Sequence, residues 1–482
     1  MLTILLRPLG TISQQILPGF TMSEDSTQQR TQQSLSILRQ HQKARIHGTH
    51  HKPFLTDPAD FGSGSSRAEL DASQAGQIIA IPKPKRTPPV MELAEVVGSS
   101  PVDDINRSGQ IVFHSVGDTG AGKHDDLGEV VESMRLDFHR PNPADQPAFF
   151  LHLGDVVYNT EYNSPQSKQK MYEPQFYEPY SNYPGKILAI PGNHDSNPQE
   201  DPNSIGAFED NFCAPLPTTA NKLAAVNSGP KRPPMYQPGV YYRLDAPFVQ
   251  ILALFSNGGE KEGVIKGNVA GDDQTKFIVE QLQAIKAERA QNPNQRKALL
   301  IAVHHPPFSG GGGHGGSSHM LADLDTACKD AGIWPDAILS GHSHVYERFT
   351  REISFGAKKM EVPYMVIGNG GHGITPMKPQ ANRKPVRTPL RGTPTAGIAD
   401  GSSDHSLRQY FNGFGHALIT VTSRILTIDL IATKTESHTP VDSVTVQLAP
   451  DFSDNKIINE TAPFEHPAEG ERETMHTKKA LV

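Results

Sequence analysis

Five short apolar runs, each followed by a turn that carries Asp, Asn or His, constrain the fold of this 482-residue chain more than any other feature. Gly or Pro bounds these runs, as is typical of buried strands. In α/β sheets, ligands bind beyond the carboxyl ends of the strands, so five such ends favour one shared polar site. The runs cover residues 110–116, 148–153, 186–190, 297–303 and 337–340, and the turns are Gly117-Asp118, Gly154-Asp155, Gly192-Asn193-His194-Asp195, His304-His305-Pro306 and Gly341-His342-Ser343-His344.

The polar side chains at these strand ends form a set of oxygen and imidazole donors. Its members are Asp118, Asp155, Tyr158, Asn193, His304, His342 and His344, with no sulfur among them. Such a set suits iron, zinc or manganese better than calcium or a structural zinc ion. Two metal ions neutralise the charge of a phosphoester, lower the pKa of a bound water and place the resulting hydroxide in line with the leaving group. Building such a two-metal site takes about seven ligands, which is the size of this donor set.

The five motifs, in this order, resemble those of the calcineurin-like metallophosphoesterases, which read D-x-H, G-D-x-x, G-N-H-D/E, a lone or paired His, and G-H-x-H. The first motif departs from this pattern, because Gly120 stands where most members have a ligand His. Tyr158 lies three residues after Asp155. The loss of the histidine and the presence of this tyrosine together resemble the purple acid phosphatases. The last motif continues as Val345-Tyr346-Glu347-Arg348, which is also similar to that family. The resemblance covers residues 109–448.

The resemblance implies a four-layer α/β/β/α sandwich with mixed sheets, and it implies roles for single residues. Asp118, Tyr158 and His344 would bind the first metal, Asp155 would bridge, and Asn193, His304 and His342 would bind the second. A phenolate ligand favours Fe(III) at the first position, and Fe(II), Zn(II) or Mn(II) remain open at the second. His194 would donate a proton or hydrogen bond to the phosphate, with Asp195 orienting it.

Two assignments stay open at this level. His314, in the glycine-rich loop after His304, is the candidate acid for the leaving group, and His305 and His319 compete with it. The alternative for Tyr158 is plain packing, because the segment that follows it is rich in tyrosine.

The predicted activity is hydrolysis of phosphomonoesters of the acid phosphatase type. A phosphodiesterase with the same metal core is the alternative. A non-catalytic binding protein on the same fold is disfavoured, because it predicts the loss of a ligand or of His194. We expect a small phosphorylated substrate, since a net charge of -7 gives no electrostatic reason to expect nucleic acid or an anionic membrane as partner.

Composition predicts a largely disordered arm over residues 1–108, a catalytic domain over 109–450 and a disordered tail over 451–482. The two cysteines, Cys213 and Cys328, are expected to be unpaired and mostly buried, with one disulfide between them as the alternative. No apolar run approaches the ~18 residues of a membrane span. The apolar stretch at the N-terminus is too short for a convincing signal peptide, so we expect a cytoplasmic protein, with export as the alternative that purple acid phosphatases suggest.

Overall fold

The computed structural model divides the chain into two units, Met1–Phe54 and Leu55–Val482. The described residues all belong to the second unit, so most of the predicted arm and of the predicted tail lies outside them. They are residues 81–120, 126–158, 165–196, 205–215, 232–257, 263–266, 271–293, 295–310, 314–355, 358–376, 405–433, 438–450 and 455–462.

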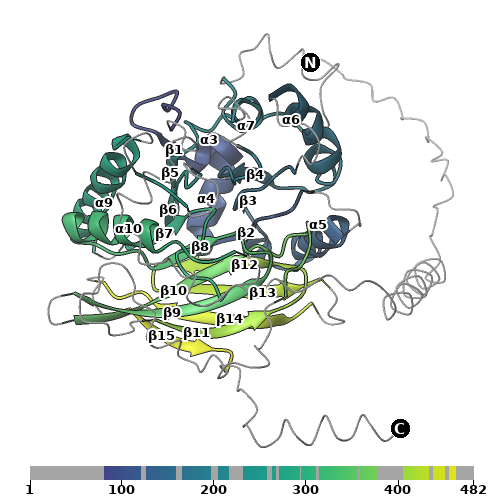
Figure 1. Ribbon diagram of the computed structural model, residues 1–482. Coiled ribbons are helices and arrows are strands. Elements are labelled where there is room, and N and C mark those ends of the chain that lie inside the picture. Colours follow the sequence, from purple (N-terminus) through teal and green to yellow (C-terminus); the bar gives the residue numbers. More distant parts are fainter. Residues whose placement is uncertain are drawn as a thin grey trace, which may run out of the picture. The chain divides into compact units, whose positions relative to one another are not determined.

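Two mixed β-sheets form the centre of the second unit (Figure 1). The first has eight strands in the order β1 (Val90–Glu92), β5 (Tyr242–Ala246), β6 (Val249–Ala253), β7 (Ala298–Ala302), β8 (Ala337–Ser340), β10 (Lys358–Ile367), β9 (Tyr346–Phe355) and β11 (His405–Phe411). The second has seven, in the order β15 (Lys456–Glu460), β14 (Pro440–Gln447), β13 (Ile425–Ala432), β12 (Gly415–Thr422), β2 (Gln110–Val116), β3 (Phe149–His152) and β4 (Lys186–Ala189). The predicted α/β fold with mixed sheets is confirmed.

The five predicted apolar runs are strands, and they divide between the sheets. β2, β3 and β4 are parallel neighbours in the seven-stranded sheet, whereas β7 and β8 are parallel neighbours in the eight-stranded sheet. All residues of β3, β7 and β8 are buried, which explains why these strands read as continuous apolar runs. A single cluster of buried apolar side chains contains residues of both sheets.

Helices flank the sheets, and their ends carry local sequence signals. Ser317 caps α10, because its Oγ accepts a hydrogen bond from Met320 N at 3.2 Å, and Gly332 ends the helix in the left-handed conformation. α9 buries its apolar face, which carries Phe277, Ile278 and Leu282. The helices are α3 (Leu93–Val97), α4 (Ser99–Ser108), α5 (Asp126–Leu136), α6 (Pro165–Tyr172), α7 (Gly206–Phe212), α9 (Asp273–Gln291) and α10 (Ser318–Ala331), with short turns η2 (Asp137–His139), η3 (Pro143–Asp145) and η4 (Glu173–Tyr177).

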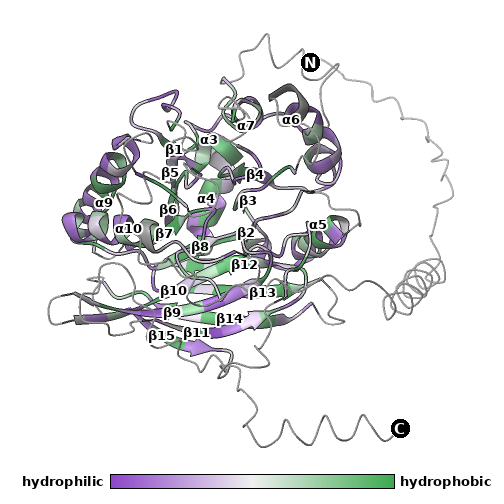
Figure 2. Cartoon of the chain, viewed as in Figure 1, coloured by the Kyte–Doolittle hydropathy of each residue, from purple (hydrophilic) through white to green (hydrophobic). Residues whose placement is uncertain are grey.

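The apolar residues lie mainly on the central strands, and the hydrophilic residues lie mainly on the outer helices (Figure 2). Figure 2 shows apolar segments along β12 and β13, and hydrophilic segments on the outer helices α6 and α9. Cys213 and Cys328 are free and buried, as expected. Among the described residues, no helix is both long and apolar enough to cross a membrane.

Two described strands outside the predicted catalytic domain of residues 109–450 leave no signal in the composition. β1 pairs in parallel with β5, with Met91 opposite Leu244, and β15 pairs with β14 at the edge of the other sheet. The physical reason is that these edge strands are only three and five residues long. Such short elements are stabilised by pairing with distant partners, which composition does not reveal.

Backbone hydrogen bonds join the two sheets where the predicted strands end. Gly117 N donates to Ile367 O at 2.9 Å, which ties the end of β2 to the end of β10. His372 N, which follows β10, donates to Asp118 O, which follows β2, at 3.0 Å. The loops of both sheets therefore meet at one place.

Candidate metal centre

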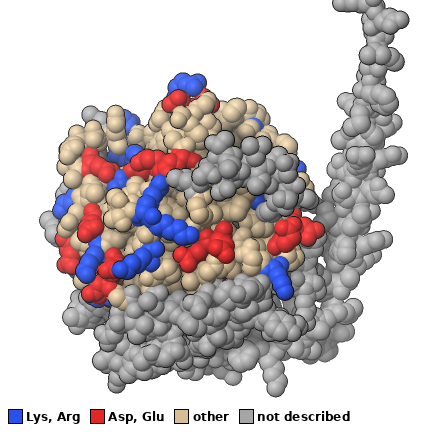
Figure 3. Space-filling model, turned by 90° about the horizontal axis from the view of Figure 1, so that it is seen from above, with Lys and Arg blue, Asp and Glu red and all other residues tan. Residues whose placement is uncertain are grey.

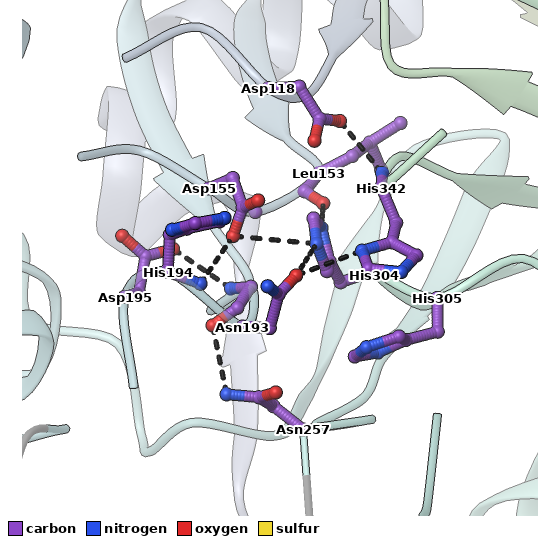
Figure 4. A network of polar contacts seen from close by, with 12 residues as sticks. Asp118, Leu153, Asp155, Asn193, His194, Asp195, Asn257, His304, His305 and His342 are labelled. Carbon is purple, nitrogen blue, oxygen red and sulfur yellow. Dashed lines mark hydrogen bonds and ion pairs between the residues drawn. The ribbon is translucent and has the colours of Figure 1, made fainter. Parts of the chain in front are cut away.

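Two groups of carboxylate and imidazole side chains lie at this meeting place and share Asp155. One contains Asp155, His304 and His342, and the other contains Asp118, Asp155 and His344. In each group, one candidate ligand atom per residue lies within 4.8 Å of the others. Figure 4 shows Asp118, Asp155, His304 and His342 pointing toward one another from separate loops. The structure thus brings predicted donors from four of the five strand ends together.

The first half of the centre gathers around the hydroxyl of Tyr158. Tyr158 Oη lies 3.1 Å from Asp118 Oδ1 and 3.2 Å from His344 Nε2. His344 Nε2 lies 3.4 Å from Asp118 Oδ1. Ligand atoms that share an ion at about 2.1 Å stand about 3.0 Å apart at right angles and about 3.4 Å apart in a tetrahedron. The spacing of these three atoms therefore fits a common cation.

The second half gathers around the side-chain oxygen of Asn193. His304 Nδ1 donates to Leu153 O at 2.8 Å, which turns Nε2 toward Asn193 Oδ1 at 3.0 Å. His342 Nδ1 lies 2.9 Å from the same oxygen. His342 Nε2 is buried and has no hydrogen-bond partner among the described residues. An amide oxygen, two imidazole nitrogens and the nearby Asp155 form a donor set that suits a transition metal.

The electrostatics of the centre also favour a cation. Burial raises the pKa of Asp155, but the adjacent His304 and His194 outweigh it and hold this pKa well below its ordinary value. Burial lowers the pKa of His304, yet the charge of Asp155 outweighs burial and raises it to about 9. Burial and the charges of Asp118 and Asp155 raise the pKa of Tyr158 well above its ordinary value. The phenol therefore keeps its proton unless a cation joins the site.

Three of the candidate ligands have left-handed backbone conformations. The φ angles are 58° at Asp118, 53° at Asp155 and 66° at His342. Such values are uncommon outside glycine and cost about 1–3 kcal/mol each. Each of these residues directly follows a glycine at a strand end. Strain of this kind gathers at functional sites, where the surrounding structure holds it in place.

Gly120 and Tyr158 depend on each other. A Cβ atom at position 120 would lie 2.4 Å from Tyr158 Cδ2, so the missing side chain makes room for the tyrosine ring. Gln175 holds the backbone of Tyr158, accepting from its N at 2.7 Å and donating to its O at 2.8 Å. Glycine at position 120 and tyrosine at position 158 therefore go together, because the ring of Tyr158 occupies the space that a side chain at position 120 would need.

The predicted catalytic residues take different places around the centre. The ring of His194 lies 4.4 Å from that of Tyr158. Asp195 accepts hydrogen bonds from Gly192 N at 2.8 Å and Val156 N at 3.1 Å, so it braces the loops of the second and third motifs. His314 is exposed, with its ring 4.1 Å from that of His342.

Of the two competitors of His314, the structure describes the side chain of His305 only. His305 is buried, and its Nδ1 lies 3.0 Å from Ser256 Oγ, behind His304 and His342. The side chain of His319 lies outside the described residues. Compared with the buried His305, His314 lies at the exposed rim of the centre.

Sequence reasoning missed His372. Its ring stacks on Tyr158 with centroids 3.4 Å apart and an interplanar angle of 4°. Its Nδ1 donates to Gly120 O at 3.0 Å. The signal was present, because His372 follows the end of β10 after Gly368-Asn369-Gly370-Gly371, the same pattern of strand, glycine turn and polar side chain as in the other motifs.

Comparison with known proteins agrees with this geometry. Residues 112–346 match the model of the calcineurin-like phosphoesterase family. These residues form a calcineurin-like phosphoesterase domain. Because the family is metal-dependent and the domain carries two candidate metal groups, its general activity is the hydrolysis of phosphoesters. No curated protein matches the sequence.

Solved structures resemble the phosphoesterase domain only distantly. The Plasmodium protein GAP50, an anchor in the inner membrane complex, is 13% identical with a TM-score of 0.40, over 77% of this chain and 95% of that chain. PhoD is 12% identical with a TM-score of 0.40, over 83% and 78% of the two chains. A dimetal phosphatase from Danio rerio is 11% identical with a TM-score of 0.35, over 67% and 96%. Likenesses of this size do not bear on the substrate.

Proposed function

We propose that the phosphoesterase domain hydrolyses phosphomonoesters with two metal ions, as a purple acid phosphatase with an acidic to neutral optimum. The observation that carries this proposal is the placement of Tyr158 Oη, 3.1 Å from Asp118 Oδ1 and 3.2 Å from His344 Nε2. In most members of the superfamily a histidine in the first motif would supply this donor. Here Gly120 leaves the space that the tyrosine ring fills.

The residues divide into two ligand sets that share one carboxylate. Asp118, Tyr158 and His344 would hold the first ion, and Asp155 would bridge to the second, which Asn193, His304 and His342 would hold. A phenolate ligand favours Fe(III) in the first set, and the second set accepts Fe(II), Zn(II) or Mn(II). Bound together, the ions supply neutralisation of the phosphate charge and acidification of a bound water.

Two histidines flank the centre with separate tasks. His194, beside Tyr158, would donate a hydrogen bond or a proton to the phosphate, while Asp195 keeps the loop of His194 in register. His314 stands at the exposed rim, where a leaving group departs. Its ring is close enough to His342 to reach a substrate held at the second ion.

The proposed partner is a small phosphorylated molecule, and the proposed compartment is the cytoplasm. The net charge of -7 disfavours polyanionic partners. On the face seen in Figure 3, acidic and basic side chains are interspersed rather than gathered into a region of one sign. Both features support a substrate that is recognised in the centre itself.

The test is the visible spectrum and the metal content of the purified protein, together with hydrolysis of chromogenic monoesters and diesters. We expect a broad band near the middle of the visible range, which Tyr158→Phe abolishes. The matched control is Tyr172→Phe, because Tyr172 is equally buried and its hydroxyl has no hydrogen-bond partner among the described residues. This control should keep the band.

A colourless protein that holds two zinc or manganese ions and prefers the diester would refute the proposal. Tyr158 would then be a packing residue, and phosphodiester hydrolysis would become the assigned activity of the same domain.

A further inference from the structure

We propose that Glu347 is a positioning residue for His314, because its buried carboxyl group holds the glycine-rich loop on which His314 lies. Glu347 belongs to β9 and is fully buried. The loop runs from Ser309 to Gly316, and residues 309, 310 and 314–316 of it are described. The inference rests on the proposed function, in which His314 faces the leaving group of the substrate.

Glu347 and Arg348 are neighbours in sequence but serve different parts of the fold. Successive side chains of a strand point to opposite faces. Arg348 Nε lies 2.8 Å from a carboxylate oxygen of Asp442, on β14 of the other sheet. Glu347 instead contacts the glycine-rich loop. Its carboxyl group is therefore free to act on that loop.

The carboxyl group of Glu347 contacts the first two residues of the loop. Gly310 N donates to Glu347 Oε1 at 3.0 Å and to Oε2 at 2.9 Å. Ser309 also forms a hydrogen bond with this side chain. Because Gly310 has no side chain that could pack, its place depends on the hydrogen bonds of its backbone. Glu347 thus fixes the beginning of the loop.

Both residues that Glu347 holds are joined to the backbone around His314. Ser309 Oγ donates to His314 O at 2.9 Å. Gly310 forms an isolated antiparallel bridge with Gly315, the residue after His314. The backbone at His314 is therefore tied to Glu347 by two routes, and the ring of His314 lies 4.1 Å from that of His342 at the centre.

The protonated carboxyl group completes this set of hydrogen bonds. The hydroxyl of Ser309 has one hydrogen to donate, and His314 O accepts it. The contact between Glu347 and Ser309 then uses a hydrogen of the carboxyl group. Burial raises the pKa of Glu347 to about 7, so the carboxyl group carries this hydrogen at acidic pH. A glutamine offers the same donor and acceptor, and it should replace Glu347.

The chemistry of the leaving group separates positioning from general structural support. In the proposed reaction His314 gives its proton to the leaving oxygen as the P–O bond breaks. A basic alkoxide needs this proton, whereas nitrophenolate departs almost equally well without it. Loss of a residue that positions His314 should therefore slow hydrolysis of alkyl esters selectively. Loss of a residue that only supports the fold should slow both reactions equally.

The experiment compares kcat of the metal-loaded, full-length protein for the p-nitrophenyl and the glycerol ester of phosphate. Glu347→Ala should lower kcat by about 100-fold for the glycerol ester and by less than about 3-fold for the p-nitrophenyl ester. Glu347→Gln should stay within about 3-fold of the wild type for both. Adding Glu347→Ala to His314→Ala should cause no further loss. The matched control is Glu352→Ala, which removes an exposed carboxylate from the same strand.

Amide hydrogen exchange of the loop gives a readout that does not depend on catalysis. Glu347→Ala should speed the exchange of Gly310 N–H by about 10-fold, because the amide loses its acceptor. Ser309→Ala is a milder variant, which keeps Glu347 and should still slow hydrolysis of the glycerol ester selectively. Its control is Ser115→Ala, since the buried hydroxyl of Ser115 donates to Leu151 O at 3.0 Å, within the sheet.

Equal losses of kcat for both esters, equal damage from alanine and glutamine at position 347, or unchanged exchange of Gly310 would each overturn the proposal. A protein that hydrolyses neither ester, but whose loop exchanges faster in Glu347→Ala, would refute the proposed function and support the hold of Glu347 on the loop. Failure of the proposed function and failure of this inference therefore give different results.

Discussion

Gly120→Ala tests whether the space at position 120 exists to admit Tyr158. The new Cβ would lie 2.4 Å from Tyr158 Cδ2 and 3.0 Å from Tyr158 N. Ordinary contacts begin near 3.4 Å, so the ring has to retreat by about 1 Å. The ring has little room to retreat, because the ring of His372 stacks on it with centroids 3.4 Å apart. The side chain of Gln175 also holds the backbone of Tyr158, through hydrogen bonds with both its N–H and its C=O.

The magnitude follows from this geometry. Overpacking by one methyl group costs about 1–3 kcal/mol of unfolding free energy. A misplacement of about 1 Å at a reacting centre costs up to about 100-fold in rate. We therefore expect Gly120→Ala to lower kcat for a chromogenic monoester by about 10–100-fold and to shift or bleach the visible band, with a smaller loss in urea unfolding.

The control lies in the neighbouring loop. Gly373 follows His372, and a Cβ atom built there meets no atom within 4 Å, so Gly373→Ala should leave rate and spectrum unchanged. Neither glycine has a positive φ, so both substitutions are free of backbone strain. A Gly120→Ala protein with the rate and the band of the wild type would show that Tyr158 does not depend on this space.

Two further predictions concern the buried charges behind the centre. Asp442→Ala should lower the free energy of unfolding by about 3 kcal/mol in urea. The reason is that the fully buried guanidinium of Arg348 loses the carboxylate of Asp442, which lies 2.8 Å from its Nε. The control, Asp104→Ala, removes an exposed ion pair with Arg107 and should change stability by less than about 0.5 kcal/mol. Burial raises the pKa of Glu347 from 4.5 to about 7. Between these two pH values the folded protein keeps the proton on Glu347, whereas the unfolded chain has released it. The free energy of unfolding should therefore fall by about 3 kcal/mol as the pH rises from 4.5 to 7. Glu347→Gln should flatten that part of the pH dependence of unfolding and exposed Glu352→Gln should not; equal slopes in both variants would contradict the assignment.

The core strands could be predicted from sequence because burial on both faces leaves a direct trace in it. β2 begins and ends at the predicted residues, Gln110 and Val116, and β8 does so at Ala337 and Ser340. β1 leaves no such trace, since a strand of three residues is formed by its pairing with β5. Elements that are stabilised by distant partners are visible only once the fold is known.

The same distinction separates the phosphoesterase centre from the buried cluster of histidines around Asp137. The phosphoesterase centre could be predicted because each donor directly follows a buried strand, so the rule of strand ends brings distant motifs to one edge. His114 and His416 lie inside strands, where a polar residue on a strand face gives no hint of its neighbours. Their convergence on Asp137 depends on the register of β12 with β2, in which Leu418 pairs with His114. No local pattern encodes that register.

The left-handed conformations at the centre are held by hydrogen bonds between its loops. Asp118 Oδ2 accepts a hydrogen bond from His342 N at 2.8 Å, and Asp155 Oδ1 accepts one from His194 N at 2.8 Å. Each carboxylate thus fixes the backbone of another motif while presenting its own oxygen to the centre. About 1–3 kcal/mol of strain at each of these positions is offset by bonds that already exist between the loops. A substitution that breaks one cross-bond should therefore misplace the candidate ligands of two motifs at once.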